Sequence, residues 1–191
     1  MTAASTPKGE RRRATLVEAA AELLVEGGFD AIRHRAVAER AGLPLASTTY
    51  YFDSLEELIT AAVELSGRRE LSRGREQLDR IGTEPRGVDT VVELVLDQLL
   101  GEDSTYDAVL ARYERLVTTG RRPYLRPVVH TMQGELYGLL KEIFARSGRP
   151  IDDKRVRQLI ALVDGAVVNA LIEADPDPRA VASAMLRDAL T

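Results

Sequence analysis

Residues 32–58 read IRHRAVAERAGLPLASTTYYFDSLEEL, and this stretch decides the fold of its part of the chain. Its apolar spacing predicts two short helices, over about residues 33–40 and 44–52, joined by a tight turn. Gly42 lies in that turn and can adopt a left-handed conformation without a Cβ penalty. Pro44 suits the first position of the second helix. Two short helices joined in this way are typical of a helix-turn-helix motif.

The second of these helices is predicted to expose an almost uncharged face. Thr48 and Phe52 lie four residues apart, so they share one face, which we expect to pack against Val37 and Leu43. The other positions of the helix are Leu45, Ala46, Ser47, Thr49, Tyr50 and Tyr51. Such a face suits the major groove of DNA, where hydroxyls meet phosphates and base edges and small apolar groups meet thymine methyls. The alternative is a helix packed against its own protein.

Charge is distributed unevenly along the chain. The 191 residues carry a net charge of -4, which taken whole argues against nucleic acid as a partner. Residues 1–52, however, hold seven cations and six anions, a net of +1, whereas residues 53–191 hold 19 cations and 24 anions, a net of -5. A weakly basic N-terminal part therefore precedes an acidic remainder.

The rest of the chain reads as a series of helices. Ser54 and Glu57 form a capping box that predicts a long helix from about Leu55. Breaks rich in glycine and proline separate further segments with 3.6-residue periodicity, and no run alternates like a strand. We predict an all-α fold of about nine helices.

We expect three regions: a disordered arm over residues 1–9, a three-helix helix-turn-helix domain over residues 10–54, and a helical ligand-binding and dimerisation domain over residues 55–191. The N-terminus shows no secretory signal, and no apolar run is long enough to span a membrane. We therefore expect a cytoplasmic protein with no membrane partner.

Enzymatic function is not expected. The chain has no cysteine, which excludes disulfides, thiolate zinc sites and thiol catalysis. Its two histidines, His34 and His130, lie far apart in the sequence, and no GxSxG, HExxH or P-loop motif is present. We expect no cofactor and no metal.

The segment from Arg11 to Leu58 resembles the N-terminal domain of TetR-type transcriptional regulators. The similarity runs through an amphipathic first helix ending in EGGF (26–29) and through VAERAGL (37–43). It continues through Tyr50, Phe52, Ser54, Glu56 and Leu58.

The resemblance implies which residues face DNA. Residues 44–51 match the family's recognition helix, so the six exposed positions named above would contact DNA, with Ser47 and Thr49 at base edges and Tyr50 and Tyr51 at phosphates. Arg33 and Arg35 match positions that usually contact the DNA backbone.

Three features depart from the family pattern. Ile32 and Arg33 replace the usual helix cap, Leu45-Ala46 replaces a common Lys-Gly pair, and Leu55 replaces a common lysine. Each lost cation removes a phosphate contact, so Arg33, Arg35 and the arginines at 11–13 would carry more of the salt-dependent affinity.

The segment 152–173 is apolar on two faces, which requires burial on two sides. We expect one face against the protein's own core and the other against a second subunit, while a central helix within a monomer is the alternative. The predicted interface residues are Ala161, Gly165, Val168, Ile172 and Met185. The resemblance likewise implies a homodimer, which would read a pseudo-palindromic operator.

The resemblance also implies a small-molecule ligand that controls DNA binding, most often as release of a repressor. Candidate pocket residues on the corresponding segments are Tyr106, Tyr113, His130, Gln133 and Tyr137. For His130, the simpler interpretation is a surface or hydrogen-bonded histidine. The alternative function is a dimeric helical interaction or sensor module without DNA binding.

Overall fold

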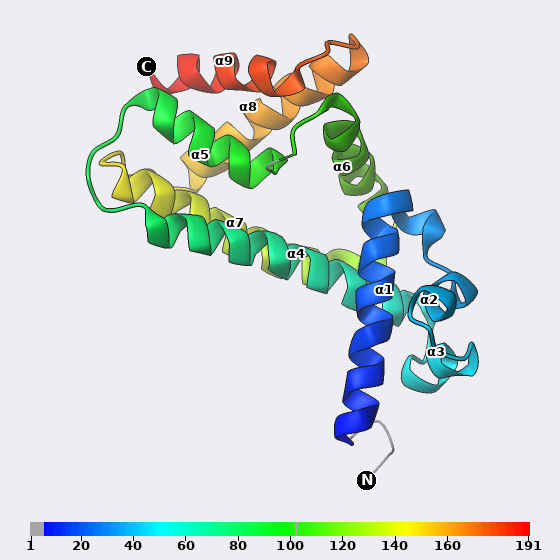
Figure 1. Cartoon of the computed structure of the whole chain (residues 1–191). Coiled ribbons are helices and arrows are strands. Elements are labelled where there is room, and N and C mark those ends of the chain that lie inside the picture. The colour runs from blue at the N-terminus through cyan, green and yellow to red at the C-terminus, as the bar shows by residue number, and fades with distance from the viewer. Residues whose placement is uncertain (1–5, 102) are drawn as a thin grey trace. The chain divides into compact units, whose positions relative to one another are not determined.

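The computed structural model describes residues 6–101 and 103–191, and within these residues it contains helices and no strands (Figure 1). This confirms the predicted all-α fold. The α-helices are α1 (Pro7–Ala31), α2 (His34–Arg40), α3 (Ala46–Tyr51), α4 (Leu55–Arg80), α5 (Val88–Leu100), α6 (Tyr106–Thr119), α7 (Arg126–Arg146), α8 (Asp153–Ile172) and α9 (Pro178–Leu190), and a 3-10 turn η2 (Pro123–Leu125) precedes α7.

The chain forms two compact units. The first contains the residues up to Arg69 together with Thr119–Val129, and the second contains Glu70–Thr118 and His130–Thr191. Helices α4 and α7 each contribute residues to both units. None of the helices described is long and apolar enough to cross a membrane.

The core of the first unit forms where α1 packs with the start of α4. Leu16, Ala20, Leu58 and Ala62 are all fully buried there. These residues recur at helical spacing, so each helix presents one apolar stripe to the other. The apolar core therefore extends past residue 54 into the long helix.

Helix α1 begins earlier than predicted and breaks where predicted. It starts at Pro7 rather than near Glu10, because the Thr6 hydroxyl accepts a hydrogen bond from Gly9 N at 3.1 Å and caps it. Residues 7–9 are therefore helical, and residues 1–5 of the predicted arm lie outside the described part of the chain. The break falls at Gly28, whose φ of 66° an L-residue rarely adopts.

The capping box predicted at the start of α4 is present. Ser54 Oγ accepts from Glu57 N at 3.1 Å. Glu57 Oε2 in turn accepts from Asp53 N at 2.8 Å, one residue before the cap. Two of the free N–H groups near the helix start are thereby satisfied.

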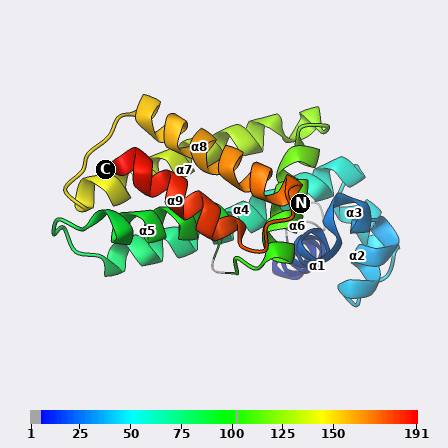
Figure 2. The same ribbon diagram turned by 90° about the horizontal axis from the view of Figure 1, so that it is seen from above.

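The second unit is built around α5, α7 and α8, which bury Val91, Leu96, Phe144 and Val163 in one apolar cluster. Helix α9 lies along α8 and α5, as Figures 1 and 2 both show. Its Leu186 is fully buried. One face of α8 and one face of α9 are thus used within the unit.

Candidate functional site

The turn between α2 and α3 has the glycine conformation that its sequence predicts, but α3 begins at Ala46 and not at Pro44 as expected. Gly42 has φ +63°. Gly42 N donates to Glu39 O at 3.1 Å and Leu43 N donates to Ala38 O at 3.0 Å. These two bonds form a Schellman motif, which ends α2 and redirects the chain into α3. Ala38 itself is buried where α2 packs against its neighbours.

Helix α3 divides into a buried and an exposed face. Thr48 and Phe52 are buried as predicted, and the Thr48 hydroxyl donates to Leu45 O at 2.8 Å. On the other side, Leu45 and Tyr50 remain 53% and 57% exposed. Ala46 and Thr49 are exposed as well.

Two of the six positions predicted as exposed are half-buried instead. Ser47 and Tyr51 each directly precede a buried residue, Thr48 or Phe52, so they border the buried face of α3. Tyr51 packs against the apolar core of the first unit. Its ring also meets Tyr50 edge-to-face, with centroids 4.9 Å apart. The most open part of the face is therefore Leu45, Ala46, Thr49 and Tyr50.

Arg33 and Arg35 are exposed at the start of α2, and no carboxylate among the described residues pairs with either. Arg33 is the N-cap residue and makes no side-chain capping bond. Its Nε donates instead to Asp30 O at 3.3 Å. The departure from the family's usual cap is thus real, and both guanidiniums remain accessible to an anion.

Arg13 and Arg40, by contrast, are engaged within the unit. The Arg13 guanidinium lies 4.7 Å from the centroid of the Phe52 ring, with Nη2 at 3.6 Å from Glu57 Oε1. Arg40 binds both carboxylate oxygens of Glu26, at 2.8 and 2.6 Å, and Nη1 also reaches Glu22 Oε2 at 3.2 Å. The hydrogen bond from Arg40 lowers the pKa of Glu26.

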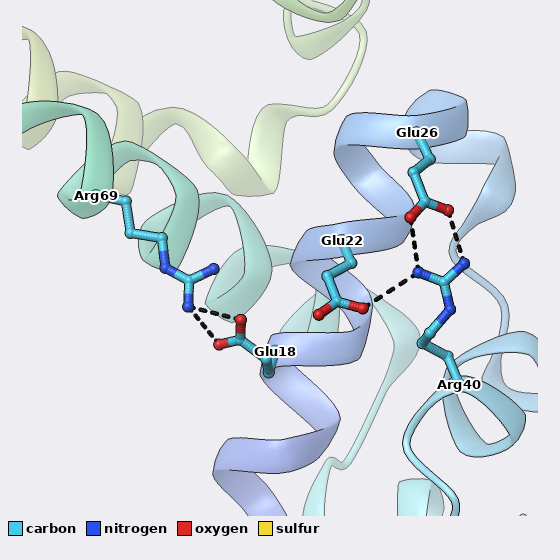
Figure 3. Close-up of polar contacts among 5 residues, drawn as sticks. All are labelled: Glu18, Glu22, Glu26, Arg40 and Arg69. Atoms are coloured by element: carbon cyan, nitrogen blue, oxygen red, sulfur yellow. Dashed lines mark hydrogen bonds and ion pairs between the residues drawn. The ribbon is translucent and has the colours of Figure 1, made fainter.

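The carboxylates that hold Arg40 belong to one acidic stripe of α1. Glu18, Glu22 and Glu26 follow each other at four-residue spacing along α1 (Figure 3). The first accepts from Arg69 Nη2 on α4 through both oxygens, at 2.6 and 2.5 Å, and the other two hold Arg40 on α2. The stripe thus fixes α2 and α4 to α1 and removes two arginines from the charge available to DNA.

In the second unit, the five predicted pocket residues differ in how deeply they are buried. Tyr113 is buried on α6, and Tyr106 is half-buried and donates to Leu171 O at 3.3 Å. Tyr137 is half-buried against the apolar cluster. His130 and Gln133 are exposed on α7, which for His130 fits the simpler interpretation.

The sequence analysis does not predict the half-buried partner of Tyr113. The Tyr113 hydroxyl donates to Asp164 Oδ1 on α8 at 2.8 Å. Burial raises the pKa of Asp164, and burial together with the charge of Asp164 raises the pKa of Tyr113. Arg112 Nη2 lies 3.0 Å from Glu70 Oε2 on α4. The sequence contains a signal for this contact, because the charged residue Asp164 interrupts the apolar pattern of α8.

The predicted dimer residues form an exposed apolar surface on this single chain. Ile172, Met185 and Val168 are 76%, 44% and 38% exposed. Ala161 and Gly165 are exposed on the same helix as Val168. An exposed apolar stripe of this kind is typical of a surface that another protein covers.

Two family models match the chain. The model described as "Bacterial regulatory proteins, tetR family" matches residues 16–62, and that described as "Tetracyclin repressor-like, C-terminal domain" matches residues 86–191. The first match contains the helix-turn-helix, and the second covers α5 to α9.

The chain is also similar to individual proteins of this kind. The HTH-type transcriptional repressor KstR of Rhodococcus jostii (strain RHA1) is 32% identical over 92 residues, which make up 47% of this chain and 40% of KstR, so less than half of that relative is matched. The crystal structure of the multidrug binding protein EbrR complexed with proflavin is 28% identical with a TM-score of 0.69, covering 93% of this chain and 98% of that chain. SCO1917, a TetR-family member from Streptomyces coelicolor A3, is 27% identical with a TM-score of 0.62, covering 93% and 96%.

Proposed function

The chain belongs to the TetR family of bacterial regulatory proteins, and from this premise we propose that it is a transcriptional repressor that a small molecule releases from its operator. Its DNA-binding form is a homodimer, and its operator is a pseudo-palindromic stretch of double-stranded DNA. The observation that carries the proposal is the exposed, nearly uncharged face of α3, which follows a turn closed by Gly42.

DNA recognition uses two kinds of contact. Thr49 and Ser47 provide hydroxyls for base edges, and Leu45 and Ala46 provide apolar surface for thymine methyls. Tyr50 and Tyr51 reach phosphates through their hydroxyls, and Arg33 and Arg35 neutralise phosphate charge. Because Ser47 and Tyr51 are half-buried, Thr49 and Tyr50 carry the larger share of the contacts.

Dimerisation uses the exposed faces of α8 and α9. A twofold axis would bring the stripe of Ala161, Gly165, Val168 and Ile172 against its own copy, with Met185 beside it, so that each patch is complementary to itself. Four helices, two from each chain, would then bury the surface that the single chain leaves in water.

The second unit is the ligand-binding part. EbrR has been crystallised with proflavin, ethidium and malachite green, and this chain aligns with it over 93% of its length. We propose that a small molecule binds among α4, α6 and α8 near Tyr113, shifts the long helix α4, and so changes the separation of the two recognition helices. Because both half-sites must be reached at once, a small shift would weaken operator binding strongly.

The test is operator binding with and without ligand. DNA selected by the wild-type protein from a random pool should be released when a compound that stabilises the protein is added. If operator affinity is the same in the presence of every stabilising compound, ligand release is wrong.

The second candidate function is a dimeric module that has lost DNA binding. Leu45 and Leu55 stand where the family commonly has lysines, and this loss of positive charge favours the alternative. The same selection separates the two functions, because a module without DNA binding enriches no sequence.

A further inference from the structure

Four charged or polar side chains form two neighbouring contacts between helices of the second unit. They come from α4, α6 and α8, as two contacts: Glu70 with Arg112, and Tyr113 with Asp164. Tyr113 belongs to the apolar cluster of the unit. The polar cluster therefore extends from the apolar core at Tyr113 to the surface at Glu70.

Such a cluster is costly to keep. A charge removed from water must be paired and hydrogen-bonded, and buried ion pairs add little net stability compared with apolar residues of the same size. The Arg112 side chain is only 18% exposed, yet its partner Glu70 is 41% exposed and reaches it with one oxygen at 3.0 Å. Charged groups held in this way are candidates for a binding site.

The guanidinium of Arg112 has an unused donor. Its Nε is buried and has no hydrogen-bond acceptor within the described part of the chain. A carboxylate can accept from Nε and an Nη of one arginine together, in the bidentate geometry that makes such pairs strong. Glu70 contacts only Nη2, so this edge of the guanidinium is half satisfied.

The charge around Arg112 favours an anion. Arg115 lies three residues further along α6 and so shares its side of the helix, and burial together with the charge of Arg112 lowers the pKa of Arg115. On the acidic side, Glu70 is the carboxylate that contacts Arg112 directly, whereas Asp164 is engaged by the Tyr113 hydroxyl. An additional carboxylate would relieve the repulsion between the two guanidiniums.

We propose that the ligand carries a carboxylate, which takes the Nε–Nη2 edge of Arg112 in competition with Glu70. The inference rests on the proposed function, because it names the ligand class for the site proposed above. Binding would release Glu70 from Arg112 and so remove the ion pair that joins α4 to α6 within the second unit. Arg69, the preceding residue of α4, is paired with Glu18 in the first unit.

The inference sets this chain apart from the EbrR complexes. Proflavin, ethidium and malachite green are cationic dyes, and two neighbouring guanidiniums disfavour a cation. Acidic and cationic probes should therefore behave in opposite ways on this protein.

The experiment compares acids with their own amides on the full-length protein. Calorimetric titrations with 2-naphthoate, salicylate and hexanoate are matched by titrations with 2-naphthamide, salicylamide and hexanamide, and ethidium serves as the cationic probe. We expect at least one acid to bind at least tenfold more tightly than its amide. Arg112→Lys, which keeps the charge but loses the Nε–H edge, should weaken that acid about tenfold.

The more specific test is the acid affinity of the Glu70→Gln variant. Removing the competing carboxylate should tighten acid binding several-fold, whereas a residue needed only for structure would weaken binding or leave it unchanged. Glu76→Gln is the matched control, because Glu76 is an exposed partner of Arg80 on the same helix and should leave the affinity as it is.

The outcomes separate this inference from the proposed function. If no acid exceeds its amide, or if Glu70→Gln fails to tighten acid binding, the inference is wrong even where ethidium releases the protein from selected DNA. If the acids bind as expected but the protein selects no DNA, the proposed function fails and the acid site stands.

Discussion

At the scale of single residues, the positive charge available to DNA is smaller than the sequence suggests. Arg40 and Arg13 are held by carboxylates of α1 and α4, whereas Arg11 and Arg12 on α1 and Arg33 and Arg35 near the start of α2 are exposed. Each phosphate that a protein neutralises adds about one unit to the salt dependence of binding. We therefore expect a shallow salt dependence for each subunit.

The Arg35→Ala variant tests the contribution of one arginine to the salt dependence of DNA binding. Losing one phosphate contact should weaken binding to all DNA sequences about equally and lower the slope of log affinity against log salt by about 1. Fluorescence anisotropy with a labelled operator across a salt series measures both effects. Arg80→Ala, which removes an exposed arginine from the end of α4 in the second unit, is the control, and an equal slope for the two variants would remove Arg35 from the interface.

Two aspartates of α8 should shift stability in opposite directions with pH. The pKa of Asp164 is raised above 3.8 by burial, so wild type should lose free energy of unfolding relative to Asp164→Asn as pH rises from 3.8 through the folded-state pKa. The pKa of Asp153 is lowered below 3.8 by Lys141. Wild type should therefore lose stability relative to Asp153→Asn as pH falls below 3.8. Urea unfolding from pH 3 to pH 7 measures the stability of wild type relative to each variant. If the two differences change with pH in the same direction, the pKa shifts given for Asp164 and Asp153 are wrong.

At the scale of helices, boundaries could be predicted because their signals are local. The capping box at Ser54 and Glu57 and the left-handed Gly42 lie within a few residues of the ends that they set. Partners across the fold could not be predicted, since periodicity identifies a buried face but not what covers it. Glu18 and Arg69 are 51 residues apart, as are Tyr113 and Asp164.

The same limit explains why the exposure of two residues of α3 differs from the prediction. Spacing predicts its exposed and buried faces, but Ser47 and Tyr51 lie at the border between them, and Tyr51 packs against the core of the first unit. Similarly, the start of α1 at Pro7 depends on the Thr6 hydroxyl, a weak signal beside the later apolar pattern.

Two glycines should respond oppositely to the same substitution. Gly42→Ala places a Cβ in open space but on a backbone with φ +63°, so it should destabilise the protein by about 1 kcal/mol. Gly134→Ala lies inside α7, also in open space, and should stabilise by about 0.5–1 kcal/mol through helix propensity. Denaturant unfolding of both variants measures the difference, and a stabilising Gly42→Ala would contradict the turn geometry.

At the scale of the whole molecule, the acidic total of -4 describes mainly the part beyond residue 52. With a net charge of only +1 over residues 1–52, we expect one subunit to bind DNA weakly. Joining two half-site contacts in one dimer raises the effective affinity without new contacts. The proposed function would therefore depend on the apolar stripe of α8 and α9.

Gly165→Leu tests the dimer. A side chain at this position meets nothing within 4 Å in the single chain, so leucine is compatible with its fold, but it would collide with a partner helix at the proposed interface. Sedimentation should show a monomer, and circular dichroism should show unchanged helix content. Gly138→Leu on α7, equally open, should remain dimeric. A dimeric Gly165→Leu would move the interface elsewhere.

The central claim is that this chain reads DNA as a twofold dimer, and selection of bound sequences from a random double-stranded pool tests it most directly. The account predicts enrichment of a pseudo-palindrome whose two half-sites are separated by about one helical turn or a multiple of it. It also predicts that Thr49→Ala changes the preferred bases, while Gly165→Leu abolishes enrichment. Recovery of no common sequence, or of a single half-site bound equally well by Gly165→Leu, would contradict it.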